Sequence, residues 1–279
     1  MVVGLIGAGI GGSFSPALHE REASLLGFDY DYRLLDLDAL DRPASDVGAL
    51  VREASREGLR GLNVTHPCKQ LVVPELDDLS PEAAALGAVN TIVFRGGRFV
   101  GHNTDASGFR EAFERRLPGA RTDQVVLLGA GGAGAAVAHA ILSLGAWQLT
   151  IVDVERERAG ALAESLGAGA ADLAALADLL ADADGLIHAT PTGMEAHPGS
   201  AVPAELLDPR LWVAEVVYMP IETQLLKDAR ERGCRTLDGA AMVALQAAGS
   251  LELFTGARPD RERMLHHVDE LIAGISPAA

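Results

Sequence analysis

The sequence has few of the features that mark a membrane, secreted or metal-binding protein. It contains two cysteines in 279 residues, and Cys68 and Cys234 stand too far apart to match a metal-binding or redox motif. No apolar run approaches the roughly 20 residues of a membrane-spanning helix. The first residues read as a strand with no basic leader, so we expect no signal peptide. We therefore expect a cytoplasmic protein that binds no membrane.

Positive charge is also scarce. The chain carries 23 Lys and Arg against 39 Asp and Glu, which gives a formal net charge of -16. This charge opposes nonspecific binding to nucleic acid or anionic lipid, so we expect neither as a partner. An anionic ligand then needs a local pocket that overrides the overall field. We expect no metal site either, because we assign no third ligand to the adjacent His266 and His267.

The chain does have a regular alternation of short apolar segments with amphipathic ones, which predicts an α/β protein with parallel sheets. The expected strands are 2–6, 30–35, 61–64, 124–128, 148–152, 185–188, 211–217 and 235–237, with a hairpin of 91–94 and 98–101 around Gly96-Gly97. The expected helices are 16–26, 47–57, a short one from Pro67, 132–144, stretches within 159–184 broken near Gly167 and Gly169, 240–254 and 261–273. The pattern restarts after Leu117-Pro118-Gly119, which predicts two domains.

A glycine-rich turn follows the expected strand 124–128. Residues 129–134 read Gly-Ala-Gly-Gly-Ala-Gly, which fits G-x-G-x-x-G. A helix is expected to begin within the turn, and Asp153 ends the next strand about 20 residues further on. Glycines let the backbone approach a pyrophosphate, the helix N-terminus offers free N–H groups to its charge, and Asp153 can accept hydrogen bonds from the adenosine ribose. This context predicts a dinucleotide site.

A second match to the glycine pattern, residues 7–12, follows the first expected strand. Here the helix starts only near Ser15-Pro16, so its N-terminus cannot lie on a phosphate held by the turn. The next strand does end in an acid, Asp36, but it lies further along the chain than the pattern requires. We interpret residues 7–12 as a loop that shapes the pocket of another ligand.

Charges after the strand 148–152 bear on the choice of cofactor. The carboxylates of Asp153 and Glu155 repel a 2′-phosphate and favour NAD. Arg156 and Arg158 leave room for NADP, although they can equally be solvated helix residues. NAD is the expected cofactor, and NADP is the alternative.

Four clusters of polar residues interrupt the apolar pattern of the first half: 13–16, 63–69, 87–91 and 101–105. Taken singly, each can be ordinary capping or turn chemistry, with Ser15 and Thr104 as N-caps. We interpret His66 and His102, which lie inside two of the clusters, as walls or neighbours of a pocket.

Together, these clusters and the turn at 129–134 resemble the shikimate and quinate dehydrogenases. Later segments agree with the resemblance: His-Ala-Thr-Pro-Thr-Gly-Met at 188–194, Val-Tyr-Met-Pro at 217–220, and Asp238-Gly239 leading to Gln246-Ala247. The chain is most similar to the NAD-using quinate/shikimate subgroup, through residues 16–20, Asp153 and 218–223. The resemblance implies an N-terminal α/β substrate-binding domain at 1–105, a Rossmann-type NAD-binding domain at 106–238, and C-terminal helices at 239–279 that pack back on the first domain.

The resemblance also implies roles for single residues. Lys69 and Asp105 are similar to the catalytic pair beside the hydroxyl that becomes a ketone. The implied substrate contacts are Ser13, Ser15, Thr65, Asn90, Tyr218 and Gln246, and the implied cofactor contacts are Gly129, Ala130, Gly131, Gly132, Ala133, Gly134, Asp153, Arg158, Thr190 and Gly239. A lysine can donate to an oxygen as negative charge develops there, and a nearby aspartate can orient it. Which of the two is the formal acid or base stays open.

The implied reaction is hydride transfer between NAD(H) and shikimate/3-dehydroshikimate, with quinate/3-dehydroquinate as a second pair. The substrate is thus an anionic polyhydroxylated cyclohexene or cyclohexane carboxylate. One departure matters: the NAD-using subgroup typically carries threonine where this chain has Ser15, and serine is the pattern of shikimate-preferring enzymes. We therefore expect shikimate to be the better substrate, and an aminoshikimate dehydrogenase is an alternative.

A non-catalytic NAD-sensing regulator on a dehydrogenase scaffold is the alternative of another class. Such a protein could have lost the lysine or the aspartate, whereas this chain has both Lys69 and Asp105, so we expect an enzyme. The sequence leaves open the direction of the reaction, the choice between monomer and homodimer, and the pathway, whether chorismate and aromatic amino acid biosynthesis or quinate degradation.

Overall fold

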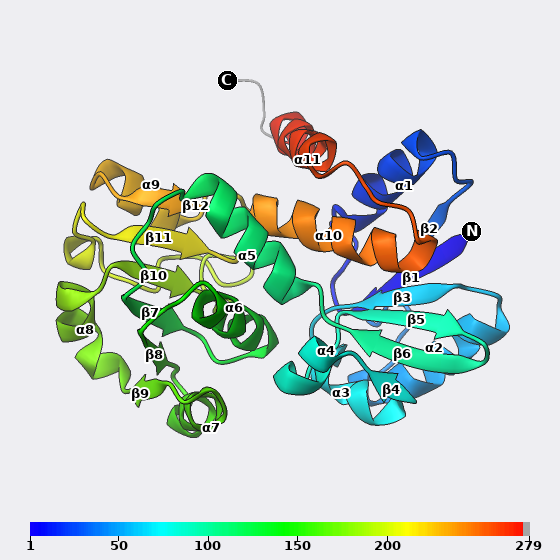
Figure 1. Cartoon of the computed structure of the whole chain (residues 1–279), viewed down its shortest axis with the longest axis horizontal. Coiled ribbons are helices and arrows are strands. Elements are labelled where there is room, and N and C mark those ends of the chain that lie inside the picture. Colours follow the sequence, from blue (N-terminus) through cyan, green and yellow to red (C-terminus); the bar gives the residue numbers. More distant parts are fainter. Residues whose placement is uncertain (276–279) are drawn as a thin grey trace. The chain divides into compact units, whose positions relative to one another are not determined.

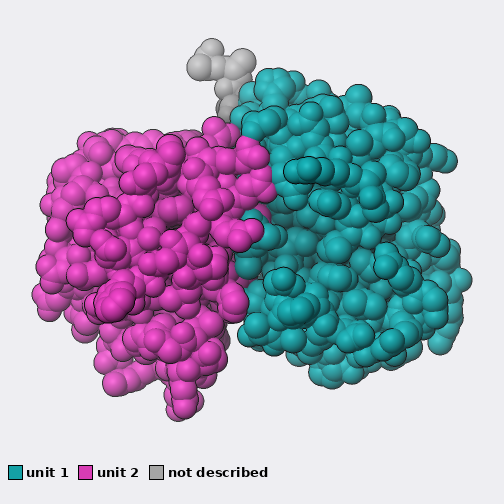
Figure 2. Space-filling view, viewed as in Figure 1, with its two compact units in different colours: residues 1–107, 243–279 teal, residues 108–242 magenta. Residues whose placement is uncertain are grey.

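The structure is a computed structural model that describes residues 1–275, and it has an α/β fold (Figure 1). Internal contacts divide the chain into two compact units, coloured separately in Figure 2. Unit 1 consists of residues 1–107 and the chain from Val243 onward, and unit 2 consists of residues 108–242. One division lies within helix α5 (Asp105–Arg116), before Leu117-Pro118-Gly119, and the other lies within helix α10 (Gly239–Thr255).

Unit 1 is built on a sheet with the strand order β2-β1-β3-β5-β6-β4. The strands β1 (Val2–Gly7), β2 (Asp31–Asp36) and β3 (Gly61–Val64) are parallel. β5 (Thr91–Arg95) and β6 (Arg98–His102) form the expected antiparallel hairpin, and the short β4 (Asp78–Leu79) runs parallel to β6. Gly96 and Gly97 have φ angles of 59° and 79°, a conformation that only glycine adopts at little cost, so the glycine pair makes this turn.

Strand β1 is apolar throughout because both faces of the sheet are covered. On one face Ile6 belongs to an apolar cluster with residues of α2 (Val47–Arg56). On the other face Val3 and Leu5 belong to a cluster with Phe254 of α10. The alternation of side chains along a strand therefore places two separate cores on the two sides of β1.

Helices α1 (Ser15–Leu25), α3 (Cys68–Leu71), α4 (Pro81–Leu86) and α11 (Arg261–Ile275) complete unit 1. Buried Glu22 on α1 accepts hydrogen bonds from Arg263 Nε at 2.8 Å and Nη2 at 2.6 Å, and from the Asp260 N–H at 2.8 Å. A carboxylate that is buried with this many donors is satisfied in place. This ion pair fixes the last helix of the unit to its first.

Unit 2 contains a fully parallel sheet with the order β12-β11-β10-β7-β8-β9. Its strands are β7 (Gln124–Leu128), β8 (Gln148–Val152), β9 (Gly169–Ala171), β10 (Gly185–His188), β11 (Trp212–Glu215) and β12 (Arg235–Leu237). Counted from β7, this is the 3-2-1-4-5-6 order of the doubly wound dinucleotide-binding fold. The order reverses between β7 and β10, and the carboxyl ends of the strands at such a point are where this fold binds ligands.

The helices of unit 2 are α6 (Gly132–Ser143), α7 (Arg156–Leu166), α8 (Leu176–Asp182) and α9 (Gln224–Glu231), with most of α5. Short 3₁₀ turns occur at Ala44–Asp46 and Val73–Glu75 in unit 1, and at Leu173–Ala175 and Ala204–Leu206 in unit 2.

The expected α/β order is confirmed, with one correction and several additions. The stretch 159–184 was expected to contain helices alone, which is wrong, because Gly169–Ala171 forms the edge strand β9 beside β8. Three small residues at a sheet edge carry no apolar alternation, so the sequence gives no sign of this strand. The expectations also did not include β4, α4, α5 and α9. No helix in residues 1–275 is long and apolar enough to cross a bilayer.

Candidate active site

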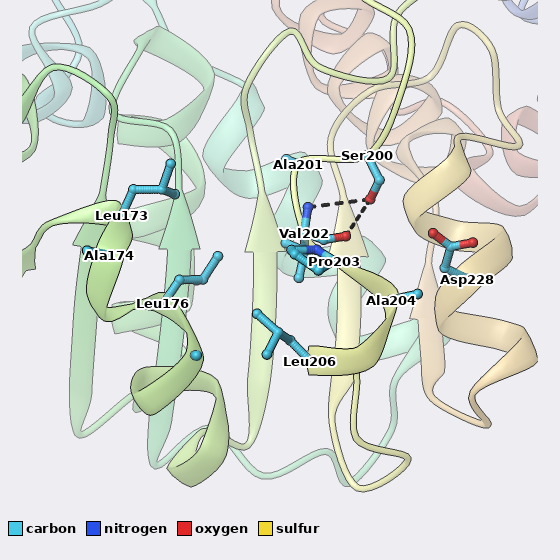
Figure 3. A pocket seen from close by; sticks show the side chains of 11 residues that line it. Leu173, Ala174, Leu176, Ser200, Ala201, Val202, Pro203, Ala204, Leu206 and Asp228 are labelled. Carbon is cyan, nitrogen blue, oxygen red and sulfur yellow. Dashed lines mark hydrogen bonds between the residues drawn. The ribbon is translucent and has the colours of Figure 1, made fainter.

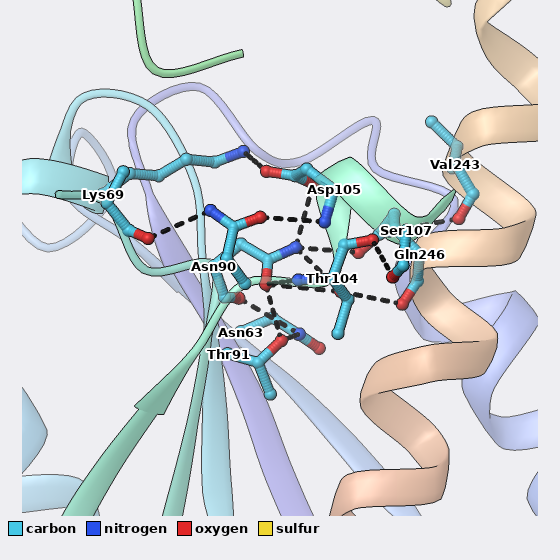
Figure 4. Close-up of polar contacts among 11 residues, drawn as sticks. Asn63, Lys69, Asn90, Thr91, Thr104, Asp105, Ser107, Val243 and Gln246 are labelled. Atoms are coloured by element: carbon cyan, nitrogen blue, oxygen red, sulfur yellow. Dashed lines mark hydrogen bonds and ion pairs between the residues drawn. The ribbon is translucent and has the colours of Figure 1, made fainter. Parts of the chain in front are cut away.

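A lysine and an aspartate meet in unit 1, as Figure 4 shows. Lys69 lies on the one-turn helix α3, and Asp105 is the first residue of α5. The distance from Lys69 Nζ to Asp105 Oδ2 is 2.6 Å, and the two side chains are 18% and 7% exposed. Because the pair is mostly shielded from water but not sealed off, a small ligand can reach the ammonium group.

Asn90 holds the other oxygen of the aspartate. Its Nδ2 donates to Asp105 Oδ1 at 2.9 Å and to Thr104 Oγ1 at 2.9 Å. Its Oδ1 accepts from the Thr104 N–H at 2.8 Å, and since a backbone N–H can only donate, the orientation of the amide is fixed. Asp105 therefore receives hydrogen bonds on both carboxylate oxygens and stays in one position.

A second layer of polar side chains holds Asn90 in turn. Thr91 Oγ1 donates to Asn90 Oδ1 at 2.9 Å and accepts from Asn63 Nδ2 at 3.0 Å. Tyr32 Oη, on β2, donates to Asn63 Oδ1, on β3, at 2.8 Å. Such fully connected buried networks rigidify a site. Asn103 acts on the aspartate directly, because its Oδ1 accepts from the Asp105 N–H at 3.0 Å.

Helix α10 contributes Gln246 to the same group. Gln246 Oε1 lies 3.5 Å from Asn90 Nδ2, and the Gln246 carbonyl accepts from Thr104 Oγ1 at 3.0 Å. A Cβ added at Gly249, one turn further along, would lie 3.2 Å from two side-chain atoms of Thr104. This close approach brings α10 against Thr104, the residue directly before α5 and Asp105.

Ser13 lies between β1 and α1, Ser15 lies at the start of α1, and Thr65 directly follows β3. The Ser15 N–H donates to Ser13 Oγ at 3.2 Å, and α1 begins at Ser15 without a side-chain cap. A Cβ at Gly7 would lie 2.4 Å from Thr65 Cγ2, so the end of β1 presses against Thr65. The possibility that Ser15 is merely an N-cap is excluded by this geometry.

The turn at residues 7–12 differs from a phosphate-binding turn in the group that its N–H donors bind. Asp36 Oδ1 accepts from the Gly9 N–H at 3.0 Å, and Oδ2 accepts from the Ile10 N–H at 2.9 Å. Two neighbouring N–H groups of the turn are therefore bound by a carboxylate of the chain itself. The helix also starts at Ser15, beyond the turn, as the sequence indicates.

The turn at residues 129–134 in unit 2 is arranged differently. Helix α6 begins inside it at Gly132, with no side-chain cap and no acidic residue in its first turn. Gly129 has a φ of 106°, and a Cβ at Gly134 would lie 2.0 Å from Gly129 O, so both glycines are required by the backbone. Around Gly131 there is no heavy atom within 4 Å of an added Cβ. The turn thus offers open space in front of a helix N-terminus, where an anion binds well.

Asp153 follows β8 at the edge of this turn. Its Oδ2 accepts from the Ala130 N–H at 2.7 Å, and its Oδ1 accepts from the Glu155 N–H at 2.9 Å. The nearby arginines are paired with carboxylates: Arg158 with Glu155, and Arg156 Nη1 with Asp172 Oδ2 at 3.1 Å. Side-chain charges around the adenosine end of the predicted site are therefore balanced or negative.

The remaining predicted cofactor contacts, Thr190 and Gly239, also lie in unit 2. A Cβ at Gly129 would lie 2.6 Å from Ala189 O and 3.0 Å from Thr190 Cγ2, so the loop after β10 packs on the glycine turn. A Cβ at Gly239 would lie 2.7 Å from Val216 O and 3.0 Å from Tyr218 Cβ. Tyr218 belongs to unit 2, whereas the other predicted substrate contacts belong to unit 1.

The structure thus joins four predicted residues in one polar group, Lys69, Asn90, Asp105 and Gln246. The resemblance implies no site role for Asn63, Thr91 and Asn103, and Thr104 was expected only as an N-cap, although all four stand inside the polar clusters. His102 is half-buried, and burial lowers its pKa. Within residues 1–275 no group of His, Cys, Asp and Glu is arranged to hold a metal ion.

A pocket of about 550 Å³ lies elsewhere in unit 2 (Figure 3). Its lining is mostly apolar, and it includes Leu173, Leu176, Val202, Pro203 and Leu206. The hydroxyl of Ser200 at its rim already bonds to Val202 O at 2.8 Å. The pocket contains none of the predicted site residues, and Asp228 is the one charged residue in its lining.

Comparison with known protein families gives two matches. Residues 5–92 match the shikimate dehydrogenase substrate binding domain, and residues 111–196 match the shikimate / quinate 5-dehydrogenase model. A shikimate dehydrogenase (NADP(+)) of Streptomyces avermitilis is 60% identical over 277 residues, covering 97% of this chain and 95% of its own length. A quinate/shikimate dehydrogenase (NAD(+)) of Corynebacterium efficiens is 46% identical over 272 residues, covering 95% of this chain and 96% of its own length.

Solved structures agree with these relatives. Quinate dehydrogenase from Corynebacterium glutamicum in complex with NAD superposes with a TM-score of 0.90 at 43% identity, over 97% of this chain and 99% of that one. Shikimate 5-dehydrogenase from Thermus thermophilus in complex with NADP(H) and shikimate gives a TM-score of 0.86 at 34% identity, over 97% and 99%. Because the models, the relatives and the solved structures all extend over both units, this chain belongs to the shikimate and quinate dehydrogenase family of NAD(P)-dependent oxidoreductases.

Proposed function

We propose that this protein transfers a hydride between shikimate and NAD, with quinate as a second substrate. The observation that carries the proposal is the contact of 2.6 Å between Lys69 Nζ and Asp105 Oδ2. A sensor that only binds a dinucleotide needs no such pair, whereas alcohol oxidation needs a group that takes the hydroxyl proton.

The chemistry of the pair follows from its position. Oxidation withdraws the proton of a secondary hydroxyl while its carbon loses a hydride, and reduction reverses both steps. When bound, the cofactor would supply the hydride acceptor as NAD⁺ and the hydride donor as NADH. Lys69 donates to the substrate oxygen as negative charge develops there, and Asp105 orients the ammonium group. The two residues handle the proton jointly, and Asn90 keeps the aspartate in place.

The remaining polar residues of unit 1 suit an anionic, polyhydroxylated ring. We assign the substrate carboxylate to the hydroxyls of Ser13 and Ser15, and the ring hydroxyls to Thr65, Asn90 and Gln246. The Thr65 hydroxyl can both donate and accept, so it can match a ring hydroxyl in either direction, and the amides of Asn90 and Gln246 lie within hydrogen-bond reach of each other. Tyr218 is assigned to the substrate as well.

The turn at 129–134 suits the pyrophosphate of the cofactor. The open space at Gly131 allows close approach, and the uncapped N-terminus of α6 supplies N–H donors and a favourable dipole. We assign the cofactor to this turn and to Asp153, Thr190 and Gly239. We accordingly propose residues 106–238 as the dinucleotide-binding domain, and residues 1–105 with the helices from residue 239 as the substrate domain.

The charges beside the turn favour NAD over NADP. A 2′-phosphate needs cationic donors, but Arg158 is held by Glu155, and Arg156 is held by Asp172. Val154, the residue directly after Asp153, is 85% exposed and offers no charge. Relatives named for either cofactor are similar to this chain, so the preference rests on these local charges.

The test is a set of initial rates for shikimate and quinate, each with NAD and with NADP. We expect the highest kcat/KM for shikimate with NAD. No turnover with any of the four combinations contradicts the proposed reaction, and faster turnover with NADP contradicts the cofactor. Quinate oxidised much faster than shikimate contradicts the substrate preference.

Three further properties complete the proposal: cytoplasmic location, no nucleic acid as partner, and a monomer or homodimer in solution. Fractionation of cells and sedimentation of the purified protein test the first and the last.

A further inference from the structure

Unit 2 contains a buried polar cluster for which the proposed chemistry has no role. His188 and Glu215 are the last residues of the neighbouring strands β10 and β11, and they are partners in the parallel register. They are 0% and 2% exposed, and His188 Nδ1 lies 2.8 Å from Glu215 Oε1. Ionisable groups inside a sheet are costly unless hydrogen bonds satisfy them, so their partners indicate what the pair holds in place.

The donors around Glu215 fix the direction of the bond to the histidine. The Val217 N–H donates to Oε1 at 3.0 Å, and Thr223 Oγ1 donates to Oε2 at 3.1 Å. The Thr223 oxygen itself accepts from the Leu226 N–H at the start of α9. Since the carboxylate accepts from these groups, His188 Nδ1 carries a hydrogen and donates to it as well. The imidazole ring is thereby held in one orientation.

The other ring nitrogen reaches the loop after β10. His188 Nε2 lies 2.5 Å from Thr190 Oγ1, and the Thr192 N–H donates to the same oxygen at 3.3 Å. Thr190 is partly exposed, in contrast to the fully buried histidine. Its hydroxyl is therefore held by a buried ring on one side and its own loop on the other.

The cluster also lies beside the other predicted cofactor contacts of unit 2. The loop at Ala189 and Thr190 packs directly on Gly129 of the glycine turn. Glu215 holds the Val217 N–H, and Gly239 packs against the carbonyl of the same residue. β7 and β10 are the adjacent strands at which the sheet order reverses, the place where this fold binds its ligand.

We propose that His188 and Glu215 are positioning residues of the dinucleotide site, which fix the Thr190 hydroxyl and the segment from Val217 before the cofactor arrives. This inference rests on the proposed function. A site that is ordered in advance binds more tightly because less freedom is lost on binding. Loosening the pair must therefore weaken NAD binding while leaving the Lys69 site intact.

The experiment is a double-mutant cycle on the full-length protein, with the Kd of NAD measured by calorimetry and the KM values by initial rates. The variants are His188→Ala, Thr190→Val and the double variant. In His188→Ala, Glu215 keeps its Val217 and Thr223 donors. Each single change is expected to raise the Kd of NAD about tenfold, and the double variant no more than about twofold further, because both act through one hydroxyl. The KM of shikimate is expected to stay within about twofold, since the reacting pair is untouched.

Thr236→Val on β12 is the matched control, because it removes a hydroxyl of unit 2 that bonds to Arg230 Nε at 3.0 Å rather than to Glu215. It is expected to leave the Kd of NAD unchanged. A Kd of NAD that stays unchanged in Thr190→Val, or losses that simply add in the double variant, overturns the positioning role. If His188→Ala does not fold, the partly exposed Thr190→Val decides alone. Wild-type protein that binds neither dinucleotide contradicts the proposed function instead, so the two failures are distinguishable.

Discussion

Asn90 Nδ2 donates to Asp105 Oδ1 at 2.9 Å and thereby leaves the second oxygen of the aspartate to Lys69. The two oxygens of one carboxylate thus have separate partners, one that holds and one that takes part in the proposed chemistry. Because the amide of Asn90 is fixed by the Thr104 N–H, neither oxygen can exchange its partner freely.

Asp105→Asn tests this arrangement. An amide at position 105 must turn a donor toward either Lys69 or Asn90, both of which donate, so one of the two contacts is lost. We expect kcat to fall by roughly 10²- to 10⁴-fold, the range of general acid–base catalysis, with the Kd of NAD within about threefold. Asp46→Asn, which removes the negative charge from an Asp–Arg contact of 2.6 Å near the surface, is the matched control and should retain full activity. A variant that keeps most of its kcat contradicts the role of Asp105.

The twin glycine turns allow a second test with a built-in control. Gly131 and Gly11 both have room for a Cβ, since no heavy atom lies within 4 Å. We expect Gly131→Ala to raise the KM of NAD about tenfold or more, because the methyl group takes space needed by the pyrophosphate. The Tm of both variants is expected to remain close to that of the wild type. Gly11→Ala should leave the KM of NAD unchanged, and an equal effect of the two changes contradicts the assignment of the dinucleotide to the second turn.

Neutralising the acids beside β8 tests the choice of cofactor. In Asp153→Asn with Glu155→Gln, two carboxylates are lost, and Arg158 loses its charged partner. We expect the ratio of kcat/KM for NAD to that for NADP to fall by at least about tenfold, which corresponds to about 1.4 kcal/mol. Glu164→Gln on the outer end of α7 is the control. An unchanged ratio shows that these carboxylates do not select the cofactor.

Much of the fold follows from the sequence because its signals are local. Strand β7, the glycine turn and α6 are adjacent in the chain, so their order predicts both the fold and the dinucleotide turn. The distinction between the two turns also follows, because the distance from the last glycine to Ser15 shows where the helix starts. The sequence does not predict the edge strand β9, because this strand is defined by its pairing with β8 and not by its own small side chains.

The sequence predicts less of the active site than of the fold. The predicted pair of Lys69 and Asp105 comes from resemblance, and their contact joins residues 36 positions apart. The support of Asn90 by Thr91 and Asn63 depends on strand register, which residue spacing does not encode. The contact between His188 and Glu215 likewise depends on the pairing of β10 with β11, which the sequence does not give.

Ser15→Thr tests the substrate preference. Ser15 is 8% exposed at the start of α1, so an added methyl group changes the pocket rather than the surface. We expect the ratio of kcat/KM for quinate to that for shikimate to rise roughly three- to tenfold, about what one methyl group contributes to discrimination. Ser24→Thr, an exposed position near the other end of the same helix, is the control and should leave the ratio unchanged. A lower ratio in Ser15→Thr contradicts the proposed role of this position.

The buried His19 makes stability depend on pH. Its ring bonds to Tyr30 Oη at 3.1 Å and lies against the rings of Tyr32 and Phe254, and burial lowers its pKa from 6.5 to about 3. Below pH 6.5 the unfolded chain takes up a proton that the folded chain does not, so stability is lost as the pH falls from 6.5 toward 3. The contribution of this one group has a slope of up to about 1.4 kcal/mol per pH unit.

Burial also lowers the pKa of His102 and His267, which act in the same direction, so the test compares slopes rather than absolute values. The free energy of unfolding by urea should be measured at several pH values between 4.5 and 7.5 for the wild type and for His19→Gln. The glutamine can still bond to Tyr30 and Ser250 but takes up no proton in the unfolded chain. We expect the free energy of unfolding to fall less steeply below pH 6.5 in the variant, because its unfolded chain takes up one proton fewer. Equal slopes in the two proteins contradict a neutral, buried His19.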